Sequence, residues 1–403
     1  MYTVIGNVAT FQKGFAFKSK DYQKFGHRII RVSNLNKNAY DESDCIFIDE
    51  EKAKAYAQYT LNTNDAVIST VGSWPTNPES VVGKVTIIPQ SINGSLLNQN
   101  AVRLRAINGC TQEYLNYLLL SDEFKSYIIG TAQGSASQAS IKLEDIRKFA
   151  FDLPIEDTQN KITHILSILD SMILNNKKIN DNLEQQAQTI FRAWFMEYVP
   201  FGGALPADWI RSTLGAICSC ELGGTPSRAK PEYWNGNIPW INSGEVNRFR
   251  IIKPSEMITE LGLSKSATKI LPVKTTVIAI TGATLGQVSL LEIASCANQS
   301  VVGVVPNAQL PYEFIYPFIK ANIQELISHQ TGGAQQHINK QNVENLPVVL
   351  PSEEVLKEYV GLVGGLYAMI ANNCFENEKL SAIRDSLLPR LMSGEIDVSN
   401  IVI

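Results

Sequence analysis

The chain has 403 residues, of which 44% are hydrophobic and 18% charged, and its formal net charge is −4. This composition is typical of a globular protein with two or more domains and sizeable cores. It excludes a generally basic nucleic-acid-binding protein, and no run approaches the roughly 18 apolar residues of a membrane span. Six scattered cysteines lack disulfide or zinc spacing, which indicates a reduced, cytoplasmic protein.

Segments from the start of the chain return in its second half. Ile5-Gly6-Asn7-Val8 resembles Leu214-Gly215-Ala216-Ile217, and 98–102 resembles 298–302. Residues 137–195 align with 334–392 without a gap, a shift of 197 residues. Two copies of about 200 residues predict a pseudo-two-fold molecule within one chain, too few repeats for a solenoid. Such a molecule suits a ligand that is itself roughly two-fold, such as duplex DNA.

The first part of each repeat mixes strands and helices. Short β-rich runs such as 67–70 and 276–280 are bounded by Gly, Pro and Asn, and helices are expected at 113–129 and 312–328. The pattern predicts the α+β class, with two similar mixed α/β modules separated by two long helices. The expected segments are a first module at 1–152, a first long helix with linker at 153–206, a second module at 207–349, and a second long helix with tail at 350–403.

The long helices, expected at about 156–198 and 353–394, follow an apolar heptad that predicts an antiparallel coiled coil. A long amphipathic core helix is the alternative. Asn176 and Asn373 occupy equivalent seam positions and are expected near the centre of the bundle, where a polar residue fixes register. Pro389 is expected to bend or end the second helix. The residues expected to pair the helices are Asn176, Asn373, Leu169, Leu183, Leu366 and Leu380. The seam is expected at positions 162, 165, 169, 172, 176, 179, 183, 186, 190 and 193, and at 359, 362, 366, 369, 373, 376, 380, 383, 387 and 390.

Basic residues cluster at comparable places in the two repeats. Residues 13–37 carry seven cations against Asp21 alone, net +6, and residues 228–253 carry five cations against Glu232 and Glu245, net +3. These clusters either contact DNA phosphates or form a solvated face, and charge alone does not separate the two.

Motifs for catalysis are missing. The sequence has no Walker loop, no HExxH and no Gly-rich dinucleotide loop after a strand. It also lacks the Asn/Asp-Pro-Pro-aromatic tetrapeptide of amino-methyltransferases. One nuclease-like string, Asp44 with Glu50 and Lys52, offers two carboxylates and a lysine for a metal-dependent nuclease. A structural coiled-coil adaptor without DNA contact is the other alternative.

Polar, Gly-punctuated loops recur in both repeats and carry the donors that DNA recognition requires. Cations are expected on phosphates and amides or hydroxyls on base edges or in close support. Trp234, Trp240 and Trp194 are expected in cores rather than as base-stacking platforms. The candidate DNA-binding residues are Lys13, Lys18, Ser19, Arg31, Ser33, Asn34, Gln133, Ser135, Gln138, Thr225, Ser227, Arg228, Lys230, Asn242, Ser243, Gln335, Gln336 and His337.

The strings GGTPS…YWNGNIPWINSGEV, ITGATLGQV, TGGAQQHI and LLPRLMSGEIDV resemble specificity subunits of type I restriction-modification enzymes. The resemblance covers essentially the whole chain, although the first module has QKGFAFKS in place of GGTPS. It implies a non-catalytic subunit that binds double-stranded DNA through two target recognition domains and reads a bipartite, asymmetric sequence. It further implies that the long helices seat two adenine methyltransferase subunits, which bind S-adenosylmethionine, while this chain needs no cofactor or metal. A separate motor subunit would cut DNA.

Overall fold

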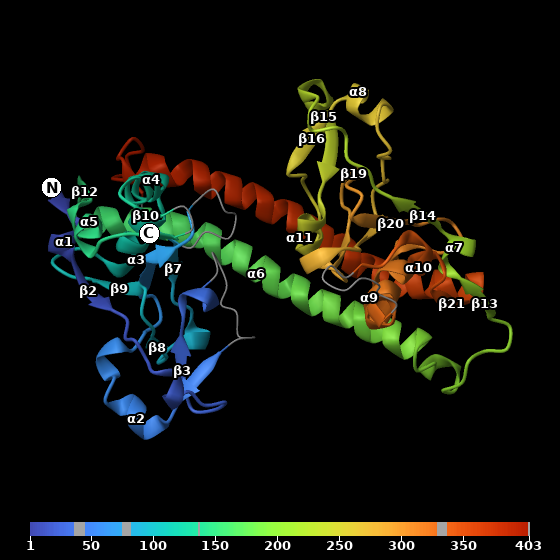
Figure 1. Cartoon of the computed structure of the whole chain (residues 1–403), viewed down its shortest axis with the longest axis horizontal. Helices are drawn as coiled ribbons and strands as arrows, with labels where there is room; N and C mark the ends of the chain where they lie inside the picture. Colours follow the sequence, from blue (N-terminus) through green and yellow to red (C-terminus); the bar gives the residue numbers. More distant parts are fainter. Residues whose placement is uncertain (36–44, 75–81, 136–137, 329–336, 402–403) are drawn as a thin grey trace. The chain divides into compact units, whose positions relative to one another are not determined.

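The computed structural model describes residues 1–35, 45–74, 82–135, 138–328 and 337–401. The chain divides into two compact units, Met1–Ser171 with Leu380–Ile403, and Met172–Lys379. Each unit contains one mixed module and parts of both long helices (Figure 1). These units do not test the boundaries of the four segments expected from the sequence, which therefore remain a prediction. No described helix is both long and apolar enough to cross a membrane.

The first module is built from small sheets in a fixed strand order. Its largest described sheet is antiparallel with the order β2-β9-β5-β7. A second, mixed sheet has the order β4-β3-β8. A pair β1-β12 closes the module, and a hairpin β10-β11 adds to β6. The strands are β1 Tyr2–Val4, β2 Ala9–Lys13, β3 His27–Ile30, β4 Ile46–Ile48, β5 Ala66–Ser69, β6 Val71–Gly72, β7 Val85–Ile87, β8 Leu96–Leu97, β9 Ala101–Ala106, β10 Gln133–Ser135, β11 Gln138–Ser140 and β12 Ala150–Asp152.

The second module repeats three of these four sheets with the same strand order. Its sheets have the orders β14-β20-β17-β18, β16-β15-β19 and β13-β21, and β15 pairs in parallel with β19 as β3 does with β8. The internal duplication predicted from sequence is therefore a duplication of the fold. The strands are β13 Ile210–Thr213, β14 Ser219–Leu222, β15 Trp234–Ile241, β16 Glu256–Ile258, β17 Thr276–Ala279, β18 Val288–Leu290, β19 Cys296–Ala297, β20 Val301–Val305 and β21 Pro347–Leu350.

Short helices cover the sheets, and one of them departs from the prediction. The segment 113–129 is two helices, α3 Gln112–Leu120 and α4 Asp122–Gly130, because Ser121 is extended and its Oγ accepts a hydrogen bond from the backbone N–H of Phe124. Its counterpart α9 runs unbroken over Tyr312–Ser328 as predicted. The other helices are α1 Ile5–Val8, α2 Glu50–Lys54, α5 Leu143–Lys148, α7 Leu214–Ile217, α8 Glu260–Ser264 and α10 Lys340–Glu344.

The two long helices, α6 Glu156–Phe195 and α11 Glu353–Met392, are antiparallel in both units. In the first unit Asp170 of α6 accepts a hydrogen bond of 2.8 Å from Arg384 of α11, and Ile162 packs into the same core as Leu391. In the second unit partners again run in opposite directions along the two helices, as the amide contacts below show. Pro389 does not end α11, which continues three residues to Met392.

Four asparagines form two symmetric pairs across the helices of the second unit. The Asn176 Nδ2 donates to the Asn377 Oδ1 at 3.1 Å, and the Asn373 Nδ2 donates to the Asn180 Oδ1 at 2.8 Å. Asn176 and Asn373 lie at the middle of their helices as expected, but Asn176 bonds to Asn377 and Asn373 bonds to Asn180. Asn180 and Asn377 were missed, although the 197-residue shift relates them to each other as it relates Asn176 to Asn373.

The buried seam departs by one residue from the predicted heptad over most of both helices. Ile162 and Tyr359 are buried as predicted, but Met172 and Met369 are 42% and 50% exposed. A straight helix drifts about 20° per heptad, and buried polar residues, which an apolar pattern does not register, take part in the seam. Among the paired leucines, Leu380 is buried and the others are half-buried. The observed buried positions include Leu166, Ile173, Asn180, Glu184 and Ala187 in α6, and Val363, Tyr367 and Ile370 in α11.

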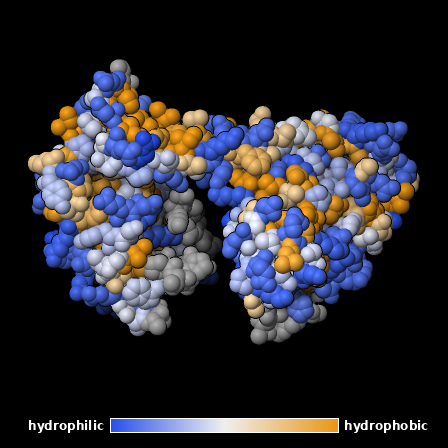
Figure 2. All heavy atoms as spheres, turned by 90° about the horizontal axis from the view of Figure 1, so that it is seen from above, coloured by the Kyte–Doolittle hydropathy of each residue, from blue (hydrophilic) through white to orange (hydrophobic). Residues whose placement is uncertain are grey.

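This offset leaves an apolar strip exposed on the helices of the second unit. Met172 and Ile179 of α6 are seven residues apart on one helix face, as are Leu362 and Met369 of α11, and all four side chains are at least 36% exposed. Figure 2 shows hydrophobic patches among hydrophilic residues on the face that it presents. We call these four residues the exposed helix strip.

Candidate nucleic-acid interface

A glycine begins the candidate DNA-binding loop of each module at the same point of the fold. The N–H groups of Gly14 and Gly223 donate to the carbonyls of Ala101 and Val301, each at 3.0 Å. A Cβ atom at Gly14 would lie 1.8 Å from the carbonyl oxygen of Asn98, and one at Gly223 would lie 2.1 Å from that of Asn298. Only glycine fits this approach, so both loops leave the large sheet and pass the three-stranded sheet in the same way.

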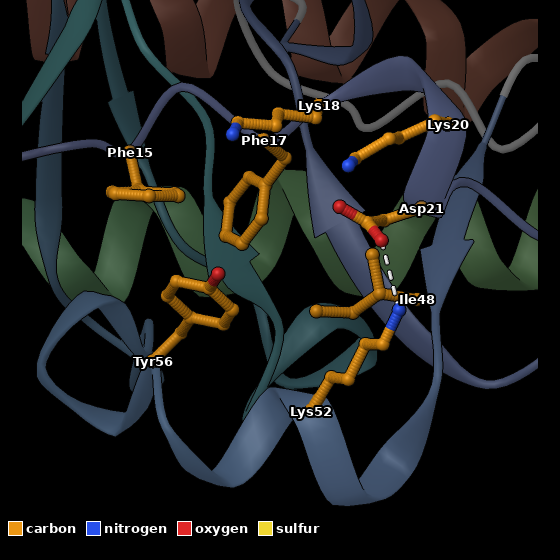
Figure 3. A pocket seen from close by; sticks show the side chains of 8 residues that line it. All are labelled: Phe15, Phe17, Lys18, Lys20, Asp21, Ile48, Lys52 and Tyr56. Atoms are coloured by element: carbon orange, nitrogen blue, oxygen red, sulfur yellow. Dashed lines mark hydrogen bonds and ion pairs between the residues drawn. The ribbon is translucent and has the colours of Figure 1, made fainter.

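In the first module this loop presents cations above a cluster of aromatic side chains. Lys13, Lys18 and Ser19 are exposed. Lys18 and Lys20 stand at the rim of a cavity of about 280 Å³ whose wall includes the rings of Phe17 and Tyr56 (Figure 3).

The acidic residue of this cavity, Asp21, is neutralised by an ion pair with Lys52. Asp21 accepts a hydrogen bond of 2.8 Å from Lys52, which holds the pKa of Asp21 below its ordinary value. The carboxylate is therefore compensated, and the exposed lysines give the rim a positive potential that attracts phosphate.

The short 3-10 turns after β3 and β15 are held by their own polar side chains. These turns are Val32–Asn34 and Ser243–Asn247. Asn34 is 1% exposed and its Oδ1 accepts from the N–H of Arg31, while the Asn242 Oδ1 accepts from the N–H of Gly244. Asn34 is therefore a supporting residue, because its burial removes it from contact with a base edge. Ser33 is exposed, and Arg31, Asn242 and Ser243 are half-buried at the same turns.

In the second module the candidate cations are exposed but engaged. The guanidinium of Arg228 lies 3.6 Å from the ring centroid of Trp234 and forms a bidentate ion pair with Glu256. This hydrogen bonding keeps the pKa of Glu256 below its usual range. Lys230 donates to the hydroxyl of Tyr233 at 3.1 Å. A phosphate contact by Arg228 must therefore compete with a carboxylate, which was not foreseen from the sequence.

The other candidates of this loop lie beside those cations. Thr225 is exposed and donates to the side-chain oxygen of Gln299, and Ser227 is exposed while its carbonyl accepts from the Trp234 indole at 3.2 Å. Trp240 is 2% exposed and donates to the carbonyl of Gly224, which confirms its expected core position.

In each module the Gly/Gln/Ser loop belongs to strands other than those that carry the loops described above. Gln133, Ser135 and Gln138 are exposed on the hairpin β10-β11, where the Trp74 indole donates to the Ser135 carbonyl at 2.7 Å. In the second module His337 is exposed and forms an isolated bridge with Thr281, at the place where β11 pairs with β6 in the first. Gln335 and Gln336 lie outside the described residues.

The nuclease-like string does not form a site in the part of the chain that the structure describes. Glu50 contacts the His27 ring at 3.1 Å, and Lys52 is paired with Asp21, so the two side chains have separate partners. Asp44 lies outside the described residues. No group of three or more described His, Cys, Asp or Glu side chains is arranged to hold a metal ion. The nuclease alternative therefore has no support.

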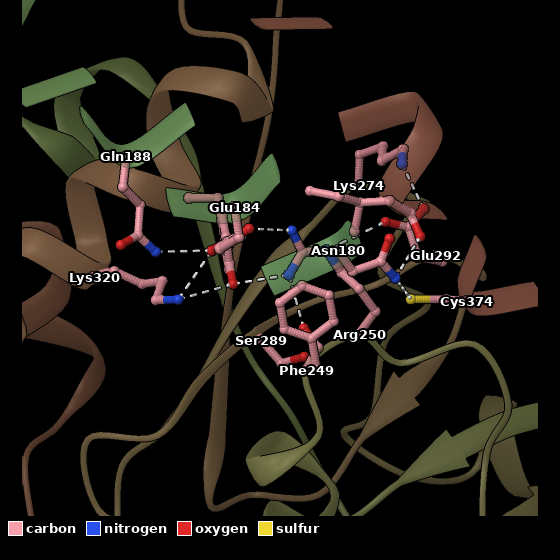
Figure 4. A network of polar contacts seen from close by, with 12 residues as sticks. Asn180, Glu184, Gln188, Phe249, Arg250, Lys274, Ser289, Glu292, Lys320 and Cys374 are labelled. Atoms are coloured by element: carbon pink, nitrogen blue, oxygen red, sulfur yellow. Dashed lines mark hydrogen bonds and ion pairs between the residues drawn. The ribbon is translucent and has the colours of Figure 1, made fainter. Parts of the chain in front are cut away.

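A buried ion network ties the second module to α6 within its unit (Figure 4). Arg250, whose side chain is 1% exposed, donates to Glu184 of α6 at 2.7 Å, and Lys320 of α9 donates to the same carboxylate at 3.0 Å. Burial alone would raise the pKa of Glu184, but the two cations lower it overall. Glu292 completes the network by pairing with Lys274.

Comparison with known proteins supports the family resemblance. The model of the type I restriction modification DNA specificity domain matches residues 2–185 and 206–361. The specificity subunit of the type I restriction enzyme MjaIX from Methanocaldococcus jannaschii is 26% identical over 319 residues, covering 75% of this chain and 73% of that protein. The HindI specificity subunit from Haemophilus influenzae is 24% identical over 357 residues, covering 70% of this chain and 77% of that protein.

A solved structure shows the same fold. The S subunit of a type I restriction-modification system from M. genitalium superposes with a TM-score of 0.56 at 16% identity, covering 99% of this chain and 96% of that one. The duplicated topology, the two antiparallel long helices and the matched family model agree on one conclusion. The chain belongs to the family of type I restriction-modification DNA specificity subunits, with one copy of the specificity domain in each of its repeats.

Proposed function

We propose that the two modules read the two halves of a bipartite, asymmetric DNA target. The observation that carries this proposal is the combination of three sheets of the same strand order with different loop chemistry. The first module presents exposed lysines around aromatic rings, whereas the second presents an arginine stacked on Trp234 and paired with Glu256. Two copies of one scaffold with unlike reading surfaces suit two unlike half-sites.

Phosphate contacts are assigned to the cations, and base or supporting contacts to the polar loop residues. Lys13, Lys18, Arg228 and Lys230 are exposed and contact mainly phosphates. Arg228 does so by exchanging Glu256 for a phosphate. Base edges or close support are assigned to Ser19, Arg31, Ser33, Gln133, Ser135, Gln138, Thr225, Ser227, Asn242, Ser243, Gln335, Gln336 and His337.

The long helices are proposed to separate the modules and to seat two methyltransferase subunits. Each helix has 40 residues and is therefore about 60 Å long, more than one DNA turn of about 34–36 Å. The exposed helix strip supports a partner on these helices, because Met172 and Met369 are equivalent positions and both are exposed. The partner subunits bind S-adenosylmethionine and methylate adenine in the cytoplasm. A separate motor subunit cuts DNA, and this chain contributes recognition without a cofactor.

Exchange of one module tests the proposal directly. Residues 207–349 are replaced by the corresponding module of a relative, and the methylome of a host that expresses the chimera with the methyltransferase is sequenced. We expect one half-site to change and the other to stay as in the unmodified chain. A change in both halves would contradict independent reading, and a complex without sequence-selective, salt-sensitive DNA binding would favour the adaptor alternative.

A four-residue insertion in α6 tests the spacing role separately. We expect the number of base pairs between the half-sites to change while the bases read in each half stay the same. A gap that does not change would remove the helices from the determination of spacing.

A further inference from the structure

Both three-stranded sheets have a three-residue bulge at the start of the central strand, next to the candidate loops. In the first module Gln23 bridges to Phe47 of β4 and His27 pairs with Ile48, which leaves residues 24–26 looped out. In the second module Trp234 and Ile238 both pair with Ile258 of β16, which leaves residues 235–237 looped out. β-Bulges re-aim side chains and are frequent next to functional sites.

A glycine fixes the geometry of both bulges. A Cβ atom at Gly26 would lie 2.4 Å from the carbonyl oxygen of Ile48, and a Cβ atom at Gly236 would lie 2.4 Å from that of Ile258. Gly26 also has a φ of +123°, which a side chain would strain. Both glycines therefore approach the carbonyl of the corresponding strand residue, although Gly26 directly precedes the paired His27 and Gly236 lies two residues before the paired Ile238. Phe25 and Asn235, the residues before them, are members of these corresponding three-residue segments.

These two preceding residues are exposed and chemically unlike. Phe25 is 81% exposed, the most exposed large hydrophobic side chain in the described chain. Asn235 is exposed in the left-handed region with a φ of +61°, and its amide has no hydrogen-bond partner among the described residues. An exposed phenyl ring does not stabilise the isolated module, and an unpaired amide on a constrained turn does not stabilise it either.

The charge around Phe25 favours DNA over an apolar protein partner. Lys18, Lys20 and Lys24 are exposed in the same segment, and the one acidic residue there, Asp21, is paired with Lys52. Exposed apolar side chains flanked by cations are used by DNA-binding proteins as wedges at base steps, while the cations neutralise phosphates.

We propose that the residue before the bulge glycine contacts DNA bases in both modules, with Phe25 as an apolar wedge at a base step and Asn235 as an amide donor and acceptor at a base edge. This proposal rests on the proposed function and adds to it the residue that makes the half-sites chemically different. An asparagine amide matches the donor and acceptor pair that adenine shows in the major groove. A phenyl ring reads instead how easily a step unstacks.

The test for Phe25 uses the complex of this chain with its methyltransferase on duplexes that carry its methylome-defined target. 2-Aminopurine replaces single adenines along the half-site, and its fluorescence rises where a step is unstacked. We expect one position to brighten with the unmodified chain. Phe25→Ala should abolish this rise and weaken binding at least tenfold, whereas Phe25→Leu should retain part of both effects.

Tyr2→Ala is the matched control, because Tyr2 is 75% exposed but lies on β1 in another sheet. It should leave the fluorescence and the affinity unchanged. The second module is tested with Asn235→Gly, which removes the amide and keeps the positive φ. It should relax the other half-site at one base pair in a panel of single-base variants, with methylation of the first half-site unaltered.

The outcomes separate the inference from the proposed function. If the unmodified complex methylates no bipartite sequence, the proposed function fails. If it does, and Phe25→Ala and Asn235→Gly match it in fluorescence, affinity and base-pair panel, the inference is overturned. Equal losses in Phe25→Ala and Tyr2→Ala would also overturn it, since exposure alone would then explain the effect.

Discussion

Replacing Glu184 with Gln should strongly destabilise the second unit. Arg250 holds Glu184 at 2.7 Å and Lys320 holds it at 3.0 Å, and the side chains of Glu184 and Arg250 are 7% and 1% exposed. Glutamine keeps the shape but not the charge. Among the described acidic side chains Arg250 then retains Glu292, whose nearest carboxylate oxygen is 3.7 Å from its Nε, beside its neutral acceptors Tyr316 and Phe249. A buried ion pair that loses one partner costs about 3–5 kcal/mol, because the remaining charge stays desolvated.

Tryptophan fluorescence during urea unfolding measures this loss. Four of the five tryptophans, at positions 194, 209, 234 and 240, belong to the second unit, so the signal reports mainly on it. The midpoint should fall with an unchanged slope. Glu353→Gln is the matched control, because it breaks the exposed pair with Lys357 and should leave the midpoint in place. A loss for Glu184→Gln no larger than that of the control would refute the reasoning.

The same variant makes a pH prediction with a definite sign. The pKa of Glu184 lies below the ordinary 4.5 in the folded chain, so its contribution to stability is complete above about pH 4.5 and is lost as the pH falls through the lowered folded value. The difference in stability between the unmodified chain and Glu184→Gln should therefore shrink as the solution is acidified below pH 4.5. A difference that stays constant would mean that the carboxylate charge is not the cause.

Three further predictions concern the loops and the helix centre. Gly223→Ala should lower the midpoint of thermal unfolding and impair DNA binding by the complex, because the new Cβ would meet the Asn298 carbonyl at 2.1 Å; unaltered values would refute the close approach. Asn373→Ala should cost about 1–3 kcal/mol in urea unfolding, since Asn180, which is 3% exposed, loses its 2.8 Å partner; a neutral effect would show that water replaces the amide. Lys230→Ala should weaken binding of all DNA sequences alike and reduce the slope of log K against log salt by about one, so a loss confined to one sequence would contradict a phosphate contact.

Most helices and strands were predictable from the sequence, whereas individual contacts were not. The strands at 66–69 and 276–279, the helix at 312–328 and both long helices were predictable, because each depends on a local pattern of apolar residues. The break at Ser121 was not predictable, since a serine can stand either at the start of a helix or within one.

Candidate residues were predictable as a set but not in their individual roles. The repeat located the loops, and the charge pattern located their cations. Asn34 turned out to support its turn from a buried position, and Arg228 turned out to face Glu256, a residue 28 positions away. Phe25 and Asn235 were not singled out, because nothing in the local sequence marks a bulge whose glycine faces a carbonyl on the next strand.

The sequence by itself determined the duplication, the α+β class, the long helices and the family, because these are carried by repeats and periodic patterns along one dimension. Only the tertiary structure decided the seam, the asparagine pairs and the buried network around Arg250. The seam moved by one residue because Asn180 and Glu184 are buried by partners from α11 and from the second module. A polar side chain is buried or exposed according to the partner that folding brings to it, and that partner is not readable from its neighbours in the chain.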